Sequence, residues 1–422
     1  MSFSEWREVV LKDVIEFNPK ESIKKGTVTK KIGMDKLAPF QRKIDGFELA
    51  EFSGGSKFRN GDTLLARITP CLENGKTAQV MILDDDEIAF GSTEYIVMRN
   101  KTGITDNNYI FYLSLSQYVR DTAIKSMTGT SGRQRAQTDV IKNTKIMLPP
   151  LQEQKAIAHI LSTLDDKIEV NNQINKTLEN MAQAIFKQWF VDFEFPNEDG
   201  EPYKSSGGEM VESELGLIPK GWEVASLYDI ADYINGTSFK KNEVNEFEGI
   251  PIIKIVEIKN GYSKSTSFYN GTTNKAKKYY LRKRDILFSW SGNPETSIDI
   301  FIWSKEQGIL NQHIFKVEPY DYSKSYIYFL LKNFKSVFMD IASNKQTTGL
   351  GHVTVADLKR LKTPIPNEEI LSEFIKISDV IIEKIFNNMQ EIETLQSLRD
   401  SLLPKLLSGE IRVPLDEEGV VS

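Results

Sequence analysis

The chain has 422 residues, 40% of them hydrophobic and 10% aromatic, which is long for one domain and sufficient for two or three globular cores. Its single cysteine, Cys71, excludes a disulfide framework and a cysteine zinc site, and its three histidines lie too far apart for ligand spacing, so we expect no metal site. The first residues lack an apolar stretch, and no run approaches the roughly 20 apolar residues of a membrane helix. We therefore expect a cytoplasmic protein without a membrane partner.

The formal net charge of -6 conceals an uneven distribution of charge along the chain. Residues 254–284 carry a local balance of +8 and residues 120–145 a balance of +4, whereas residues 192–214 and the stretch from Glu368 onward each carry -7. Such asymmetry can place a positive field over one face of an acidic protein. A nucleic-acid partner is therefore compatible with the acidic total.

An internal repeat of about 217 residues organises the chain. Four patterns recur in the same order in the two halves, and they pair Trp6 to Val14 with Trp222 to Ile230, Phe58 to Leu64 with Leu281 to Leu287, Tyr109 to Leu113 with Tyr326 to Leu330, and Thr130 to Val140 with Thr348 to Leu358. Trp6 and Trp222 are interpreted as matched core anchors. One such match could arise by chance, but four in one order indicate a duplication.

Each repeat begins with a globular stretch of short strands and helices and ends, after a proline-marked boundary, with a long helical pattern. Between the repeats lies an acidic stretch rich in glycine and proline. The predicted segments are, in order, a first domain 1–147, a central helical spacer 148–194, a linker 195–221, a second domain 222–363, a C-terminal helical spacer 364–412 and a tail 413–422. The predicted fold class is α+β, with two mixed α/β domains joined by two long, antiparallel, coiled-coil-like helices and an internal pseudo-twofold.

Both helical segments carry an apolar stripe at heptad spacing, and each stripe has an asparagine at its centre, Asn171 in the first and Asn388 in the second. A polar residue in such a seam costs stability and selects register. For a twofold to relate the two domains, the helices must run antiparallel. We therefore predict that Asn171 and Asn388 lie within about one helical turn, roughly 5.4 Å along the axis. Exposure of both asparagines to solvent is the alternative.

Three long stretches of the chain are LPPLQEQKAIAHILSTLDDKIEVNNQINKTLENMAQAIFKQWFVDFEFP, GLIPKGWEVASLYDIADYINGT and LRDSLLPKLLSGEIRV. In this order they are similar to the central conserved region, the start of the second recognition domain and the C-terminal conserved end of type I restriction-modification specificity subunits. The resemblance implies that each domain is a target-recognition domain that reads one half of a bipartite site in double-stranded DNA. It also implies that two modification subunits, which methylate adenine with S-adenosylmethionine, and restriction (motor) subunits are partners, and that this chain itself holds no cofactor.

Glycine permits close backbone approach to DNA, and Arg and Gln suit guanine and adenine edges, which favours the loop Met127–Arg135 and its counterpart Asn344–His352 as contacts. The predicted DNA-binding residues are Lys57, Arg59, Arg67, Arg133, Gln134 and Arg135 in the first domain and Lys277, Lys278, Arg282, Arg284, Asn293, Lys345, Gln346 and His352 in the second. An ordinary polar turn is the alternative for each loop. Trp290 fits the core better than a stacking contact.

The sequence offers no catalytic residues. The only Pro-Pro, Pro149-Pro150, lacks the Asp/Asn-Pro-Pro-aromatic context of an adenine methyltransferase, and no G-x-x-x-x-G-K-[ST] loop is present. Asp199, Glu201 and Lys204 match the composition of a nuclease site but sit in the acidic linker. Two other hypotheses remain open, a coiled-coil DNA-binding adaptor without base readout and a fragment of a fused methyltransferase-nuclease.

Overall fold

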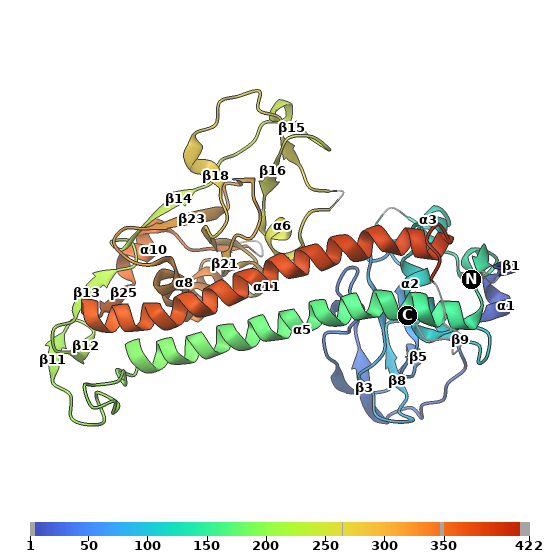
Figure 1. The fold of residues 1–422 in the computed structure, drawn as a ribbon, viewed down its shortest axis with the longest axis horizontal. Helices are drawn as coiled ribbons and strands as arrows, with labels where there is room; N and C mark the ends of the chain where they lie inside the picture. The colour runs from blue at the N-terminus through green and yellow to red at the C-terminus, as the bar shows by residue number, and fades with distance from the viewer. Residues whose placement is uncertain (1–4, 131, 264, 347–349, 414–422) are drawn as a thin grey trace. The chain divides into compact units, whose positions relative to one another are not determined.

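The computed structural model describes residues 5–130, 132–263, 265–346 and 350–413, which form two compact units. Unit 1 consists of Met1–Val170 together with Ile392–Ser422, and unit 2 of Asn171–Glu391. Each unit therefore combines a globular stretch with parts of both long helices (Figure 1). The predicted tail 413–422 lies outside the described residues except for Val413.

Unit 1 contains two four-stranded sheets, ordered β2-β9-β6-β7 and β4-β3-β8-β5, and a separate pair, β1-β10. Its elements before the first long helix are β1 (Arg7–Val10), α1 (Leu11–Val14), β2 (Ile15–Phe17), β3 (Val28–Ile32), η1 (Met34–Lys36), β4 (Glu48–Glu51), β5 (Ser56–Phe58), β6 (Thr63–Ala66), β7 (Thr77–Gln79), β8 (Ala89–Gly91), β9 (Tyr95–Asn100), α2 (Asn107–Leu115), α3 (Gln117–Lys125), α4 (Thr138–Lys142) and β10 (Lys145–Leu148). Every residue of β6 is buried, and this strand lies between β9 and β7 in its sheet.

Unit 2 repeats this arrangement after a two-stranded hairpin, with sheets ordered β14-β23-β19-β21 and β15-β17-β16-β22-β18 and pairs β13-β25 and β20-β24. Its elements before the second long helix are β11 (Met210–Ser213), β12 (Gly216–Pro219), β13 (Glu223–Ser226), β14 (Ala231–Asn235), η2 (Lys241–Glu243), β15 (Val244–Asn245), β16 (Ile250–Ile253), α6 (Ile255–Asn260), β17 (Phe268–Tyr269), η3 (Lys277–Tyr279), β18 (Tyr280–Leu281), β19 (Ile286–Ser289), β20 (Ser291–Gly292), α7 (Pro294–Ser297), β21 (Asp299–Ile302), β22 (Gly308–Leu310), β23 (Ile314–Pro319), α8 (Lys324–Asn333), α9 (Lys335–Asn344), β24 (Gly351–His352), α10 (Val355–Arg360) and β25 (Lys362–Ile365).

The duplication extends to individual backbone hydrogen bonds. The amide of Leu11 donates to the carbonyl of Thr144 at 3.0 Å, and 216 residues later the amide of Leu227 donates to Leu361 at 2.9 Å. Helices α2 and α8 both begin at a side-chain cap, where Asp106 and Ser323 accept from the amide three residues on. The predicted α+β class with an internal duplication is confirmed.

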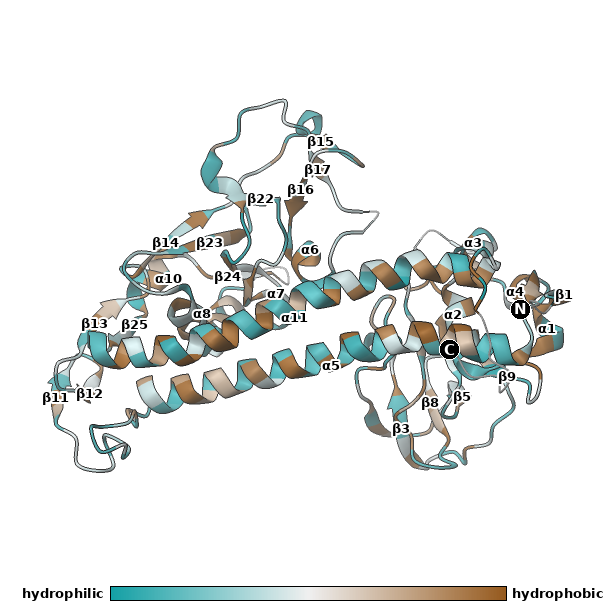
Figure 2. Ribbon diagram, viewed as in Figure 1, coloured by the Kyte–Doolittle hydropathy of each residue, from teal (hydrophilic) through white to brown (hydrophobic). Residues whose placement is uncertain are grey.

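The two long helices are α5 (Leu151–Phe190) and α11 (Glu368–Ser408). Hydrophobic residues recur along both as stripes separated by hydrophilic ones (Figure 2), which is the heptad pattern of the sequence. In unit 1, Ala156, Ile157 and Leu161 of α5 and Leu406 of α11 are buried in one core with the aromatic residues of α2. The N-terminal part of α5 is therefore part of the unit 1 core.

An aromatic cluster at the other end of the helices forms the core of unit 2. Phe186 and Phe190 of α5 lie 5.7 and 4.9 Å from the ring of Phe374 in α11, and Phe190 lies 5.9 Å from Trp222. Trp222 is buried at 6% exposure, as the matched-anchor interpretation expects, whereas Trp6 is half-buried. The C-terminal part of α5 and the N-terminal part of α11 thus complete unit 2.

Both central asparagines are buried between the helices of unit 2, with exposures of 1% for Asn171 and 2% for Asn388. The amide nitrogen of Asn171 donates to Glu391 at 2.8 Å, and that of Asn388 donates to Asn175 at 2.8 Å. Because residue numbers rise along α5 as they fall along α11, the helices run antiparallel. Each asparagine bonds to a residue three or four positions from the other, or about one helical turn.

The segment predicted as a linker, residues 195–221, is folded against unit 2. Phe195 is 4% exposed and stacks on Tyr203 and Trp222 at 4.5 and 5.3 Å. Strands β11 and β12 pair in register, and Ile218 is 3% exposed. The acidic composition concealed these few aromatic and aliphatic anchors, so that sequence reasoning assigned no core role to the segment.

The end of α11 is fixed to unit 1 by a buried carboxylate, and this contact can be tested. Glu153, 2% exposed, accepts from Arg412 at 2.6 and 2.8 Å and from the indole of Trp6 at 3.0 Å. Replacing Arg412 by Ala should lower the free energy of unfolding by about 1–3 kcal/mol, because a buried acceptor loses a charged donor. Lys145→Ala, which removes an exposed pair with Glu8, should cost less than about 1 kcal/mol. Equal effects in chemical denaturation would contradict the assigned role of Glu153.

The buried asparagines give a second test. Asn388→Ala should lower the free energy of unfolding by about 1–2 kcal/mol, because the carbonyl oxygen of Asn175 loses its donor inside the seam. Its exposed neighbour Asn387 provides the matched control, and Asn387→Ala should be neutral within about 0.5 kcal/mol. A loss with Asn387→Ala as large as that with Asn388→Ala would show that position in the seam is irrelevant.

Candidate DNA interface

The strongest candidate surface in unit 1 lies where β6 ends and β9 begins. These strands are antiparallel, with Ala66 opposite Tyr95, so Arg67 and Glu94 emerge at the same edge of the sheet. The amide of Arg67 donates to the carbonyl of Glu94 at 3.0 Å. We call the group Arg67, Glu94 and Arg135 the β6–β9 edge.

The predicted contact loop, Met127–Arg135, docks at this edge. Thr128 and Arg135 exchange backbone hydrogen bonds of 3.1 and 2.9 Å, which close the loop, and the amide of Ala136 donates to the carbonyl of Arg67 at 2.7 Å. Gly129 has φ +127°, a conformation that glycine adopts without strain. Ser131, within this loop, lies outside the described residues. The structure therefore brings Arg67 and Arg135 together, although 68 positions separate them.

The carboxylate of Glu94 holds both guanidiniums. Arg135 donates to it from Nε and Nη2 at 2.8 to 3.0 Å, and Arg67 donates from Nε at 3.1 Å. The pKa of Glu94 lies below its ordinary value, mainly because Arg135 donates a hydrogen bond to the carboxylate. Burial opposes this shift, and the hydrogen bond from Arg67 adds to it. Arg135 remains 44% exposed and Glu94 only 18%. The edge thus presents guanidinium groups that are accessible and fixed in orientation.

Arg133 and Gln134 occupy the outer part of the same loop. Arg133 is exposed and Gln134 half-buried, and neither side chain has a hydrogen-bond partner among the residues that the structure describes. The carbonyl of Gln134 accepts from the amide of Thr69 at 3.0 Å, which anchors the loop through its backbone. Both side chains are therefore available to a ligand.

Lys57 and Arg59 lie apart from this edge, because they precede β6 and Arg67 follows it. Arg59 donates to Glu21 at 2.7 and 3.0 Å, and Arg99 bridges Glu21 and Asp62. Lys57 donates to the backbone carbonyl of Glu21 at 2.8 Å. The prediction grouped Lys57 and Arg59 with Arg67, but the structure places these two in a separate internal network at the opposite end of β6.

The equivalent place in unit 2 is where β19 ends and β23 begins. Strand pairing sets Ser289 opposite Ile314, so Trp290 and His313 emerge together, with their ring centroids 6.0 Å apart. His352 lies on β24 directly opposite Ser291, and the amide of Val353 donates to the carbonyl of Trp290 at 2.9 Å. We call the group Trp290, His313 and His352 the β19–β23 edge.

Trp290 is half-buried, consistent with packing. Its ring stacks on Phe315 at 5.5 Å, and its indole nitrogen donates to Asn235 at 3.1 Å. Asn293 is exposed, but its side-chain oxygen accepts from the amides of Glu295 and Thr296 and so caps α7. Only the amide nitrogen of Asn293 is left for a base.

The second predicted loop, Asn344–His352, is described only in part, because Thr347, Thr348 and Gly349 lie outside the described residues. Lys345 pairs with Asp357, a carboxylate with 0% side-chain exposure that caps α10. The charge of Lys345 is thus engaged in the fold, whereas Gln346 and His352 are exposed.

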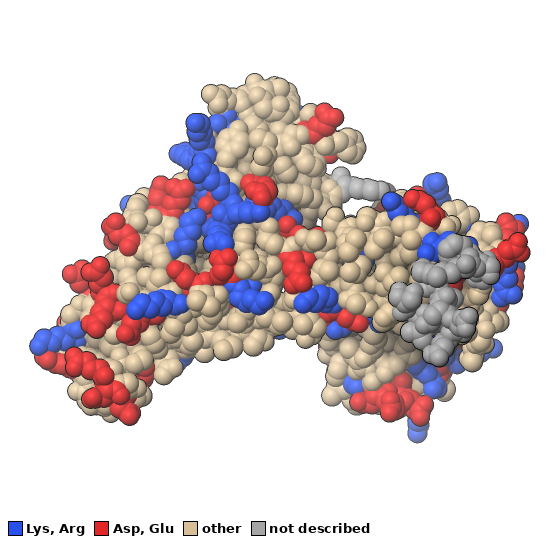
Figure 3. All heavy atoms as spheres, in the orientation of Figure 1, with Lys and Arg blue, Asp and Glu red and all other residues tan. Residues whose placement is uncertain are grey.

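The four predicted cations in the basic run of unit 2 differ in their surroundings. Lys277, Lys278 and Arg282 are exposed and have no ion-pair partner among the described residues. Arg284 instead pairs with Glu383 of α11 at 2.7 Å and lies over the ring of Phe386 at 4.7 Å. Figure 3 shows Lys and Arg side chains gathered on the part of unit 2 that carries β18.

Sequence reasoning missed two members of these edges, Glu94 and His313, and also Asn235, which accepts from the indole of Trp290. No motif marks them, because each is a single polar residue at the end of a strand. The signal was position: Glu94 and His313 immediately precede the apolar runs that become β9 and β23. Knowledge of the strand pairing was needed to place them beside the predicted residues.

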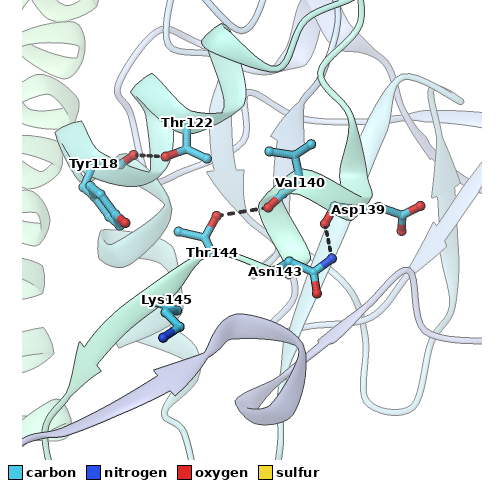
Figure 4. A pocket seen from close by; sticks show the side chains of 7 residues that line it. All are labelled: Tyr118, Thr122, Asp139, Val140, Asn143, Thr144 and Lys145. Atoms are coloured by element: carbon cyan, nitrogen blue, oxygen red, sulfur yellow. Dashed lines mark hydrogen bonds between the residues drawn. The ribbon is translucent and has the colours of Figure 1, made fainter.

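A shallow depression of unit 1 beside α3, α4 and β10 offers no comparable chemistry (Figure 4). Its polar groups are engaged locally: Thr122 donates to the carbonyl of Tyr118 at 2.8 Å, Thr144 to Val140 at 3.2 Å, and Asn143 to Asp139 at 2.7 Å. Within the described ranges, no group of three or more His, Cys, Asp or Glu could hold a metal ion, and no helix combines the length and the apolar character needed to cross a membrane.

The pattern of the type I restriction modification DNA specificity domain matches this chain twice, over residues 3–180 and 219–399. The chain is 30% identical over 326 residues to the type I restriction enzyme MjaIX specificity subunit of Methanocaldococcus jannaschii, covering 74% of this chain and 71% of that relative. It is 27% identical to the HindI specificity subunit of Haemophilus influenzae, covering 84% and 87%.

The two matched ranges begin at equivalent points of the two repeats, so each repeat carries one copy of the domain. The chain therefore belongs to the type I restriction-modification DNA specificity family, whose description assigns DNA specificity to both copies. The type I restriction-modification S subunit from M. genitalium, solved by crystallography, has the same fold, with a TM-score of 0.51 over 96% of both chains at 14% identity.

The engagement of Lys345 with Asp357 yields a prediction on pH. Burial alone would raise the pKa of Asp357, but hydrogen bonds from Lys345, Thr354 and Arg360 outweigh it and hold that pKa below the ordinary value of 3.8. A carboxyl group whose pKa is lower in the folded than in the unfolded state stabilises the fold at pH values above its unfolded-state pKa. This contribution disappears as the pH falls through the folded-state pKa. Lys345→Ala should therefore destabilise by about 1–3 kcal/mol at neutral pH, and the deficit should shrink below about pH 4.

Urea unfolding of Lys345→Ala from neutral pH to about pH 2 measures this difference. Lys376→Ala, which removes an exposed lysine of α11, is the matched control and should be neutral throughout. A deficit that grew as the pH fell would reverse the sign and contradict the assigned pairing.

Proposed function

We propose that this chain is the DNA-reading subunit of a type I restriction-modification complex, in which unit 1 and unit 2 each read one half of an asymmetric, bipartite site in double-stranded DNA. The observation that carries the proposal is that two units with the same backbone pairing present different side chains at equivalent places. A shared backbone positions two related readers, and different side chains select different bases.

The proposed partners follow from the family. Two modification subunits bind the chain and supply adenine methylation with S-adenosylmethionine, and restriction subunits supply translocation and cleavage. The chain itself is proposed to act in the cytoplasm as a non-catalytic subunit without a cofactor. Its contribution is positioning, because the modification subunit must flip the target adenine out of the duplex.

A reconstitution experiment tests this division of labour. The purified chain alone should neither methylate nor cleave DNA, and site-specific methylation should appear when it is mixed with its modification subunit and S-adenosylmethionine. Sequencing of methylated adenines then gives the bipartite site. Methyl transfer by the chain alone would support a fused methyltransferase, and binding without any site preference would support an adaptor without base readout.

Exchange of one unit tests independent reading. Replacing residues 1–147 by the corresponding part of a relative should change one half-site and leave the other intact, because each unit reads its own half. The reciprocal exchange of residues 222–363 is the matched control and should change only the other half. A change of both half-sites by either exchange would contradict the proposal.

A further inference from the structure

The two edges defined above are equivalent position by position. Ala66 lies opposite Tyr95 in unit 1 and Ser289 opposite Ile314 in unit 2, which makes Arg67 equivalent to Trp290 and Glu94 to His313.

The third position follows from the incoming loop. Ile68, which follows Arg67, forms a β-bridge with Arg135, and Ser291, which follows Trp290, pairs with His352. Arg135 is therefore equivalent to His352. The backbone hydrogen bonds agree. In unit 1 the amide of Ala136, which follows Arg135, donates to the carbonyl of Arg67 at 2.7 Å. In unit 2 the amide of Val353, which follows His352, donates to the carbonyl of Trp290 at 2.9 Å. Three segments distant in sequence thus meet at one place in each unit.

The same backbone carries different chemistry in the two units. In unit 1 the positions hold two guanidiniums around one carboxylate, and in unit 2 they hold an indole and two imidazoles. Core positions beside them keep their apolar character, since Leu65 and Phe288, two residues before Arg67 and Trp290, are both fully buried. Variation at exposed positions of a constant scaffold is what two readers of different half-sites require.

We propose that these three equivalent positions are the specificity-determining site of each unit: Arg67 and Arg135, held by Glu94, read a guanine in one half-site, and His313 and His352, beside the packed ring of Trp290, read a different base in the other. The proposal rests on the proposed function. It assigns the reading to the ends of β6, β9, β19 and β23 and to one end of each loop, rather than to the outer loop residues or to the basic run.

The geometry of Arg135 favours guanine. Its Nε and Nη2 donate to Glu94, which leaves the N–H groups of Nη1 and the second hydrogen of Nη2 directed away from the carboxylate. That remaining pair of donors matches O6 and N7 of guanine, the commonest specific contact of arginine. Glu94 acts as a positioning residue, because it fixes the plane of the guanidinium before DNA arrives and so reduces the ordering cost of binding.

The β19–β23 edge lacks such a fork. His313 and His352 are both exposed, and Asn235, which accepts from the indole of Trp290, keeps an amide nitrogen as a donor. These groups make single hydrogen bonds and stack, so the second half-site is read without a guanidinium at this place.

Methylated-adenine sequencing with the full complex, chain and modification subunits together, tests the proposal. Arg135→Ala should relax one G·C position of a single half-site, with preference for the original base falling by about 5- to 150-fold, while the other half-site keeps its sequence. Arg135→Lys keeps the charge without the fork and should relax the same position. His352→Ala should relax a position in the opposite half-site only.

Glu94→Gln tests positioning. It removes the charge and keeps one acceptor, so it should relax the same position less than Glu94→Ala does, and a merely structural role would change the amount of methylation without changing the sequence read. Arg7→Ala, at an exposed arginine of β1 in unit 1, is the matched control and should leave both half-sites intact.

The outcomes separate this proposal from the proposed function. An unchanged recognition sequence in Arg135→Ala and His352→Ala overturns the three-position site while two-unit reading stands, provided that the unit exchange still alters one half-site. Relaxation of both half-sites by one substitution also overturns it. If Arg135→Ala abolishes methylation, competition of the purified complex against duplexes permuted at each position gives the same readout, and loss of preference at one unit 1 position supports the proposal.

Discussion

The antiparallel pairing of α5 and α11 is the constraint on which the rest of the structure depends. Neither unit has a complete core without both helices, because Ala156, Ile157 and Leu161 fill unit 1 together with Leu406, and Phe186 and Phe190 fill unit 2 together with Phe374. Residues near the two ends of the chain consequently meet in unit 1, where Trp6 and Arg412 share Glu153. A change in helix register would disturb the core of both units at once.

Register has a polar component as well as an apolar one. A purely aliphatic seam tolerates a slip of one heptad at modest cost, whereas the donors of Asn171 and Asn388 must each find an acceptor. Those acceptors, Glu391 and Asn175, lie on the facing helix within one turn of the other asparagine. Within unit 2 the two asparagines therefore lie about one turn apart along the facing helices, which is the spacing that the duplicated sequence predicts.

The periodic patterns of the sequence predicted the helices and the repeated strands. The sequence did not predict which side chains pair with residues distant in the chain. Heptads located both long helices, and the repeat located equivalent strands in the two units. The separation of Arg59 from Arg67 could not be foreseen, because it depends on the length and direction of β6 and on Glu21, a distant carboxylate. The ion pair of Lys345 could not be foreseen either, because its partner, Asp357, is a buried carboxylate twelve residues away. Composition likewise concealed Phe195 in the acidic segment.

Two kinds of cation among the predicted DNA contacts differ in how they are held, and the difference suits two tasks. Arg67 and Arg135 are fixed by Glu94, so a base that meets them encounters donors already in place, at little further cost in side-chain entropy. Lys277, Lys278 and Arg282 are exposed and have no ion-pair partner among the described residues, so they can follow a phosphate backbone whose position varies with sequence. Contacts of the second kind release counterions and carry the salt dependence of binding, whereas contacts of the first kind carry discrimination. An excess of acidic residues elsewhere is compatible with both tasks, because exposed charges more than about 8 Å apart are largely screened at physiological salt.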